Sequence, residues 1–298
     1  MITELSSRFS VIQLCSVLGV SRSGYYSYTN GTSHVLSDSK AEIGEAIEEI
    51  FNFHKRRYGW RRIQGDLLDR GYQVGRHQIR SRMKEQGLIA IQPKSFVPKT
   101  TQSNPNLYRS PNLLLEEKNI PTTMHQVIVG DITYLPNKEP GCGKWLYLAT
   151  WQDLYSRRIV GWQVARHMEE SIAIDSLKKV IVAIQAQRGL IVHTDGGSQY
   201  SAKGFRSLLQ THGFRQSMTR KDNHYDNAQA ESLFSRFKAE LLDGDIFYGL
   251  EDAELRIFEF IDGYYNTIRR HSSIGNINPL AYEAVLNKKT SEDSDENN

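Results

Sequence analysis

The stretch Val127-Ile-Val-Gly-Asp-Ile-Thr-Tyr-Leu135 decides the fold, because it is rich in β-branched and aromatic residues and carries one carboxylate, Asp131, within an apolar run. Segments of similar character follow at 145–153 and 159–165, separated by turn-forming residues. Such segments predict three consecutive β-strands. A carboxylate inside a strand is costly unless it is paired or binds a cation, so Asp131 is a candidate functional residue.

Downstream of these strands the pattern alternates between helix and strand. The sequence predicts helices at 171–188, 201–212, 227–242 and 251–269, and strands at 190–194 and 214–218. Three strands followed by alternating helices and strands favour a mixed α/β domain.

Two more acids stand out beside Asp131. Asp195 ends the fourth predicted strand, in Ile191-Val-His-Thr-Asp-Gly-Gly-Ser-Gln-Tyr200, and Glu231 lies in a predicted helix. Taken singly, an Asp after a strand is more often a turn residue, and Glu231 is more often an ordinary surface residue. Together, three hard oxygen ligands favour Mg²⁺ or Mn²⁺ over zinc. Two such ions support phosphodiester chemistry.

The helix that carries Glu231 has further polar residues on the same face. Asn227, Glu231 and Lys238 stand at i, i+4 and i+11, and Lys238 is a candidate to neutralise a DNA phosphate beside the metal site. The alternative is an exposed lysine in a salt bridge. His193 and His271 are candidates for contacting phosphate or orienting ligands, but lone histidines are more often structural or surface groups.

The N-terminal third is helical and basic. Short helices are expected at 5–28, where Gly19 is a break and Ser21 a cap, and a longer helix at 39–54. From His54 to Lys99 there are 12 Lys/Arg against 3 Asp/Glu. Two short helices follow within this block, with a glycine-containing turn between them. The second, at 75–86, has a face of three cations, which are Arg76, Arg80 and Lys84.

This arrangement is typical of a helix-turn-helix that enters the DNA major groove. A solvated surface with no partner is the alternative for the basic block and for the three cations. The chain has no run of about 18 apolar residues and no signal-peptide pattern. Cys15 and Cys142 predict neither a metal pair nor a disulfide, as suits a cytosolic protein. There is no Walker loop and no dinucleotide-binding glycine motif.

Several of these stretches together resemble the bacterial insertion-sequence transposases with a retroviral-integrase-like catalytic core, in particular the product of the second reading frame. In that family, 35 residues separate the second and third acids of an Asp, Asp, Glu triad, as they separate Asp195 and Glu231 here. A basic residue seven positions after the glutamate matches Lys238. The matching stretches are Asp131-Ile-Thr-Tyr134, 193–200, 225–232, and Tyr265-Asn266 through Arg269-Arg-His-Ser-Ser-Ile-Gly275.

Upstream, Tyr58-Gly-Trp-Arg-Arg-Ile63 resembles the family's helix-turn-helix, and Leu18-Gly-Val-Ser-Arg-Ser-Gly-Tyr-Tyr26 resembles its opening. The resemblance covers about residues 12 to 285. Two positions depart from the pattern. Ile128 stands where a tryptophan is frequent, and Gly130 stands where threonine is common. Neither change removes a ligand, but both alter the packing expected around Asp131.

The resemblance implies a ribonuclease-H-like mixed sheet flanked by helices and preceded by all-α helix-turn-helix segments. The expected organisation is a helical segment at 1–38, a helix-turn-helix domain at 39–91, a Pro-rich linker at 92–122, a catalytic core with C-terminal helices at 123–288, and a disordered acidic tail at 289–298. The implied metal ligands are Asp131, Asp195 and Glu231. Expected DNA contacts are Asn227, Lys238, Arg61, Arg62, Arg76, Arg80 and Lys84, and expected supporting residues are Thr133, His193, Gln199 and Tyr200.

The implied activity is cleavage and joining of DNA at terminal inverted repeats with two Mg²⁺ or Mn²⁺ ions. A homodimer or larger assembly is expected, because both DNA ends must meet, and the expected location is the cytoplasm, at the nucleoid. The chain lacks the leucine-heptad segment that the family carries in its upstream frame, so a fused partner is expected. Two rival functions stay open, which are a catalytically inert DNA-binding regulator and a ribonuclease-H-type nuclease that cuts without joining.

Overall fold

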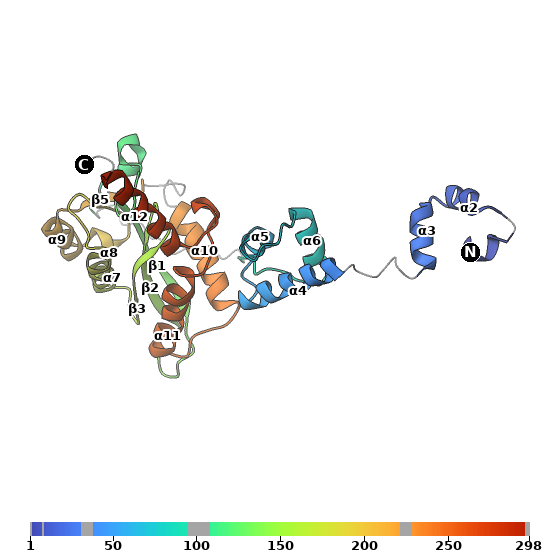
Figure 1. Ribbon diagram of the computed structural model, residues 1–298. Helices are drawn as coiled ribbons and strands as arrows, with labels where there is room; N and C mark the ends of the chain where they lie inside the picture. The colour runs from blue at the N-terminus through green and yellow to red at the C-terminus, as the bar shows by residue number, and fades with distance from the viewer. Residues whose placement is uncertain (1, 8, 31–37, 94–107, 221–227, 296–298) are drawn as a thin grey trace. The chain divides into compact units, whose positions relative to one another are not determined.

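The computed structural model describes residues 2–7, 9–30, 38–93, 108–220 and 228–295 (Figure 1). The chain divides into two compact units, Met1–Ile89 and Ala90–Asn298. Within the described ranges, no helix is both long and apolar enough to cross a membrane.

The first unit opens with three short helices, α1 (Ile2–Leu5), α2 (Val11–Val17) and α3 (Arg22–Thr29). As predicted, Gly19 interrupts the helical run, with a positive φ of 63°. The Ser21 hydroxyl accepts a hydrogen bond from the Gly24 amide at 3.0 Å, which caps α3. This satisfies one of the amide donors that a helix start leaves unpaired.

The rest of the first unit is a three-helix cluster of α4 (Asp38–Phe53), α5 (Trp60–Asp69) and α6 (Arg76–Glu85), in which each helix packs against the other two. Their apolar stripes meet in a core that includes Ile47, Ile63 and Ile79, all fully buried. The helix-turn-helix elements expected from the sequence are thus present, and the buried stripe fixes which side of α6 faces outward.

The second unit is built on a five-stranded sheet of order β3-β2-β1-β4-β5. Its strands are β1 (Val127–Pro136), β2 (Trp145–Asp153), β3 (Ile159–Ala165), β4 (Ile191–Thr194) and β5 (Arg215–Met218). The first three are antiparallel neighbours, whereas β4 runs parallel to β1 and β5 parallel to β4. This is the mixed sheet predicted from the sequence.

Helices cover both faces of this sheet (Figure 1). One face carries α7 (Glu170–Ala183), α8 (Ser198–Ser201) and α9 (Lys203–His212), and the other carries α10 (Ala228–Leu242) and α11 (Leu250–Phe260). The first layer closes around Trp151, which stacks on Phe205 at 6.1 Å between centroids and donates to Ser176 Oγ at 2.8 Å. The fold class is therefore the expected one, a mixed sheet flanked by helices.

Several element ends differ from the sequence prediction, and the helix expected at 201–212 is divided at Ala202 into α8 and α9. Helix α7 stops at Ala183 and not at 188, because Gln185 takes a left-handed conformation and the Ala186 amide turns back to the Ile181 carbonyl at 3.1 Å, a helix-ending arrangement that needs no glycine. The helix expected at 251–269 ends at Phe260 and continues as the π-helical turn Ile261–Tyr265.

Helix α12 (Pro279–Asp295) runs through most of the tail expected to be disordered. The sequence places Lys288 and Lys289 four residues before Glu292 and Asp293, a spacing that supports a helix. The disorder expected for this stretch is therefore corrected as far as Asp295.

The later part of the predicted linker packs against the sheet. After residue 107, short helical turns at Leu113–Leu115 and Glu117–Asn119 lie beside β5. The Leu113 amide donates to Ser217 Oγ at 2.9 Å, and the Met218 amide donates to the Pro111 carbonyl at 3.3 Å. Residues 108–122 therefore cover the outer edge of the sheet, while residues 94–107 lie outside the described ranges.

Candidate active site

Asp131 and Asp195 lie on neighbouring parallel strands at the same level. In the β1–β4 register, Val129 pairs with His193, and each aspartate comes two residues later along its own chain. Parallel strands advance together, so Asp131, within β1, and Asp195, just past the end of β4, come to the same part of the sheet. The first two acids predicted from the sequence are thus brought together by the fold.

The carboxylate of Asp195 is held by a tight turn. The Gly197 amide donates to its Oδ1 at 2.9 Å. Burial raises the pKa of Asp195 above its ordinary value, and the Gly197 amide and the positive charge of Arg109 only partly oppose this. A buried carboxylate whose charged form is disfavoured suits a position beside a cation.

Tyr200 is a buried side chain on which both aspartates act electrostatically. Its side chain is almost fully buried, and within the described part of the chain its hydroxyl has no hydrogen-bond partner. Burial raises the pKa of Tyr200 well above its usual range, and the negative charges of Asp131 and Asp195 raise it further. A buried tyrosine hydroxyl normally has a partner. An unpartnered hydroxyl close to two carboxylates therefore fits a site built around a bound group, as a metal-ion site requires.

Helix α10 carries the third predicted acid. Glu231 lies in its first turns, and α10 packs against β1. The side chain of Glu231 and all of Asn227 fall outside the described residues, so their predicted roles stay predictions. Lys238, seven residues beyond Glu231, is half-buried. Burial lowers its pKa, and the charge of Asp131 counteracts this.

Among the described side chains, no group of three or more His, Cys, Asp or Glu residues forms a metal cluster. Asp131 and Asp195 are two of the three predicted oxygen ligands, and the side chain of the third, Glu231, lies outside the described residues. These donors are carboxylates, which fit Mg²⁺ or Mn²⁺.

The supporting residues act through the framework of the site. His193 is buried, with its Nδ1 2.8 Å from Ser217 Oγ on β5. Gln199 Nε2 donates to the Met168 carbonyl at 2.8 Å, which ties α8 to the turn before α7. Thr133 is buried on β1, two residues past Asp131. The structural alternative for His193 fits this geometry.

Packing explains why position 130 is a glycine here, where threonine is common in the family that the sequence resembles. Gly130 pairs with Trp151 across the β1–β2 ladder, and a Cβ atom at position 130 would overlap the indole ring. The ring lies behind Tyr200, with 6.0 Å between ring centroids in an edge-on contact. The glycine therefore makes room for the tryptophan that supports Tyr200.

In the first unit, Arg76, Arg80 and Lys84 are all exposed on α6, as predicted from the sequence. The other two predicted DNA contacts have intramolecular neighbours. Arg61 lies over the Trp60 ring at 4.7 Å, and Arg62 donates to the Arg57 carbonyl at 3.1 Å. The three α6 cations are thus better placed to meet a nucleic acid than Arg62.

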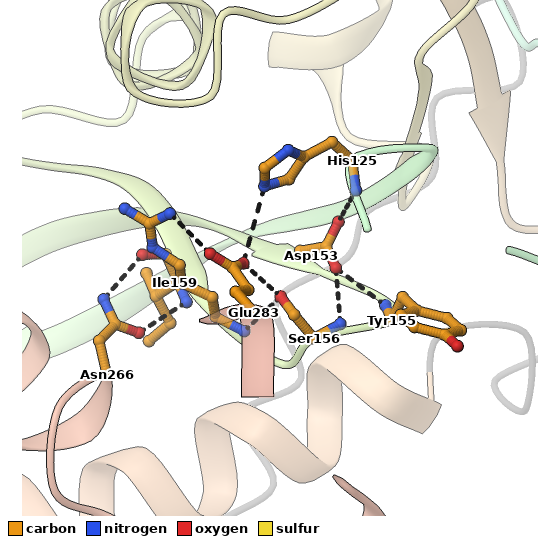
Figure 2. Close-up of polar contacts among 8 residues, drawn as sticks. His125, Asp153, Tyr155, Ser156, Ile159, Asn266 and Glu283 are labelled. Carbon is orange, nitrogen blue, oxygen red and sulfur yellow. Dashed lines mark hydrogen bonds and ion pairs between the residues drawn. The ribbon is translucent and has the colours of Figure 1, made fainter. Parts of the chain in front are cut away.

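The closing motif Tyr265 to Gly275 is used for assembly of the core. Asn266 hydrogen-bonds both the amide and the carbonyl of Ile159 on β3, at 2.9 and 3.0 Å (Figure 2). His271, one of the two candidate histidines, lies with its Nε2 3.0 Å from Arg269 Nη1. Sequence reasoning assigned no role to Asn266 or Arg269, because their partners are distant in the chain.

Figure 2 also shows a polar cluster that ties α12 to the turn between β2 and β3. Glu283 accepts hydrogen bonds from Ser156 Oγ at 2.8 Å and from Arg158 at 2.9 Å, and His125 lies 3.6 Å away. Asp153 accepts from the amides of His125, Tyr155 and Ser156. No sequence motif predicts this cluster, because its members are separated by up to 158 residues.

Family models match ranges within both units of the chain. Two models described as "Integrase core domain" match residues 121–224 and 212–279, and a model described as "HTH-like domain" matches residues 38–96.

Among curated proteins, the insertion element IS600 uncharacterized 31 kDa protein of Shigella sonnei is 40% identical over 90% of this chain and 97% of its own length. Transposase InsF for insertion sequence IS3A of Escherichia coli (strain K12) is 33% identical over 95% of this chain and 96% of its own. Among solved structures, the HTLV-2 integrase catalytic core domain in complex with magnesium (dimeric form) is 14% identical with a TM-score of 0.36, covering 53% of this chain and 94% of that chain.

Proposed function

The chain belongs to the transposases of IS3-type insertion sequences, and we propose that it cuts and joins DNA strands at terminal inverted repeats through a metal site formed by Asp131, Asp195 and Glu231. Family membership and the integrase core make it a polynucleotidyl transferase. The observation that carries the proposal is the placement of Asp131 and Asp195 at one level of adjacent strands, with the unpartnered hydroxyl of Tyr200 close to both.

The three acids would hold two Mg²⁺ or Mn²⁺ ions. When bound, such ions stabilise the charges that develop on the attacking and leaving oxygens of a phosphodiester. The chain's own residues supply the framework. The Gly197 amide fixes one oxygen of Asp195, and Tyr200 belongs to the buried hydrophobic core. Lys238, near Asp131, would neutralise a phosphate oxygen of the DNA strand.

Recognition of the terminal repeat falls to the helix-turn-helix. Arg76, Arg80 and Lys84 stand one helical turn apart on the exposed side of α6, which suits contacts to successive phosphates and some reading of base edges. Both ends of an element must be held together for joining, so the working form would be a dimer or a larger assembly. It would act in the cytoplasm at the nucleoid, with an upstream-frame segment fused to it where that segment is needed.

The experiment uses a labelled duplex that carries the element's terminal repeat, incubated with Mg²⁺ or Mn²⁺. Wild-type chain and Asp195→Asn are compared, and nicked and joined strands are separated on a gel. We expect both products from the wild type and neither from Asp195→Asn, with DNA binding retained. Nicking without joining would indicate a nuclease. Binding with no cleavage, also after fusion to the upstream segment, would indicate an inert regulator.

A further inference from the structure

Arg109 lies beside the candidate active site, although the sequence places it in the Pro-rich linker. Its Nη1 donates to the carbonyl of Thr219, the residue that directly follows β5, at 3.2 Å. A Cβ atom on Gly196, the residue after Asp195, would overlap the guanidinium group. The guanidinium therefore lies over the carboxyl ends of β4 and β5, next to Asp195.

The backbone around Arg109 is anchored on both sides. On one side, Ser201 Oγ donates to the Tyr108 carbonyl at 2.8 Å, and the Arg206 guanidinium lies 4.3 Å from the Tyr108 ring centroid. On the other, Ser110 Oγ donates to Gln216 Oε1 at 3.1 Å. These contacts hold the residue in place, so its side chain reaches the site from a fixed position and loses little entropy on binding a ligand.

Arg109 is nevertheless exposed to solvent. A guanidinium has five N–H donors, and the hydrogen bond to Thr219 uses one of them. The glycine that admits it, Gly196, stands between Asp195 and Gly197. This chain thus keeps a cation at the edge of its acidic site, with donors left to face solvent.

The charges around the two aspartates favour an anionic partner. The charge of Lys238 acts on Asp131 and that of Arg109 acts on Asp195, so both aspartates are influenced by a positive charge. A cation beside a metal ligand opposes metal binding through like-charge repulsion. A DNA phosphate relieves that repulsion, because it is attracted by the arginine and by the metal ions together.

We propose that Arg109 is a substrate-binding residue whose guanidinium contacts a non-bridging oxygen of the DNA phosphate at, or next to, the one that is cut. This inference rests on the proposed function. The competing structural role is that Arg109 only holds the turn at Thr219 or only adjusts Asp195. The two roles predict different effects of removing the Arg109 side chain. Loss of a phosphate contact changes DNA affinity and its salt dependence, whereas loss of an effect on Asp195 changes the Mg²⁺ requirement.

The test is single-turnover nicking of the terminal-repeat duplex by the full chain with Mg²⁺, measured over protein and NaCl concentrations. For Arg109→Ala we expect the half-saturating protein concentration to rise about tenfold or more, because one charge-assisted contact to the DNA is lost. The slope of log affinity against log salt should fall by about 0.9. Arg109→Gln keeps a donor for Thr219 but no charge, and should behave like Arg109→Ala. Arg109→Lys keeps the charge and should restore the slope.

Arg188 provides the matched control, because it is exposed and lies near Gly213, at the opposite end of the same two strands. Arg188→Ala should match the wild type. As a second readout, a neutral methylphosphonate is placed at each phosphate around the cut. At the contacted position it should weaken the wild type but cause no further loss in Arg109→Ala.

Two results would overturn the inference while leaving the proposed function intact. In one, the wild type nicks the repeat and Arg109→Gln equals it in half-saturation and salt slope. In the other, Arg109→Ala changes only the Mg²⁺ concentration needed for half-maximal rate. Absence of nicking by the wild type, with or without the upstream segment fused, would instead count against the proposed function, and this inference would fall with it.

Discussion

Arg269 and Glu240 form a bidentate ion pair in which both side chains are buried, with Nε to Oε2 at 2.6 Å and Nη2 to Oε1 at 2.7 Å. Burial alone would lower the pKa of Arg269, but the charge of Glu240 and its hydrogen bond raise it above the usual range. The pair joins the closing motif to α10, the helix that carries Glu231 and Lys238.

Breaking this pair should destabilise the core unit strongly. Arg269→Ala removes both charge-assisted hydrogen bonds from the buried Glu240 carboxylate, and breaking a buried ion pair by removing one partner costs about 3–5 kcal/mol in comparable cases. Denaturant unfolding of the full chain, followed through the transition of the core unit, measures the loss. Replacing both residues together, as Arg269→Met with Glu240→Leu, should recover much of it. Arg256→Ala, which breaks a more exposed pair with Asp245, should cost about 1 kcal/mol or less.

A second prediction concerns Gly130 and Trp151. Gly130→Ala places a methyl group in the space of the indole ring, and overpacking of this kind costs about 1–3 kcal/mol. Trp151→Leu alone should also destabilise, because it leaves a cavity behind Tyr200. If the two residues compete for one space, the double variant loses less than the sum of the single losses. If the losses of unfolding free energy in the two single variants simply add in the double variant, packing against Trp151 does not explain why position 130 is a glycine.

Part of the fold and part of the candidate site could be predicted from the sequence. Runs of β-branched residues predict the β-strands. Asp131 is identified as a candidate because a carboxylate within an apolar strand is costly unless it is paired or binds a cation. The early end of α7 could not be predicted, because a left-handed residue after a helix is usually glycine or asparagine and Gln185 is neither. Arg109 could not be read either, because its importance arises only when the chain folds it against Gly196, 87 positions further on.

The cluster in Figure 2 predicts a dependence of stability on pH. Burial alone would raise the pKa of Glu283, but the nearby His125, the hydrogen bond from Ser156 and the charge of Arg158 bring it below its ordinary value of 4.5. A group with a lowered pKa in the folded state stabilises the fold above its unfolded pKa and loses that contribution as pH falls through the folded value. The stability difference between wild type and Glu283→Gln should therefore be constant near neutral pH and shrink in acid. A difference that grows as the pH falls would contradict it.

On α6, Arg80→Ala should weaken binding of the terminal-repeat duplex and lower the salt slope by about 0.9, the value for one phosphate contact. Arg82 on the same helix is the control, because its guanidinium already pairs with Glu85. Fluorescence anisotropy over a range of NaCl concentrations measures both. Equal salt slopes for wild type and Arg80→Ala would indicate that Arg80 is only a hydrated surface residue and does not contact a DNA phosphate.

The central claim, that one acidic site performs strand joining, is tested most directly with a pre-nicked terminal repeat that already carries a free 3′-hydroxyl. Wild-type chain and the variants Asp131→Asn, Asp195→Asn and Glu231→Gln are incubated with this DNA, a target duplex and Mg²⁺, and joined strands are counted. We predict joined product from the wild type alone, with all four proteins binding the repeat equally. Joined product from any of the three variants, or none from the wild type even when fused to its upstream segment, would contradict the assignment.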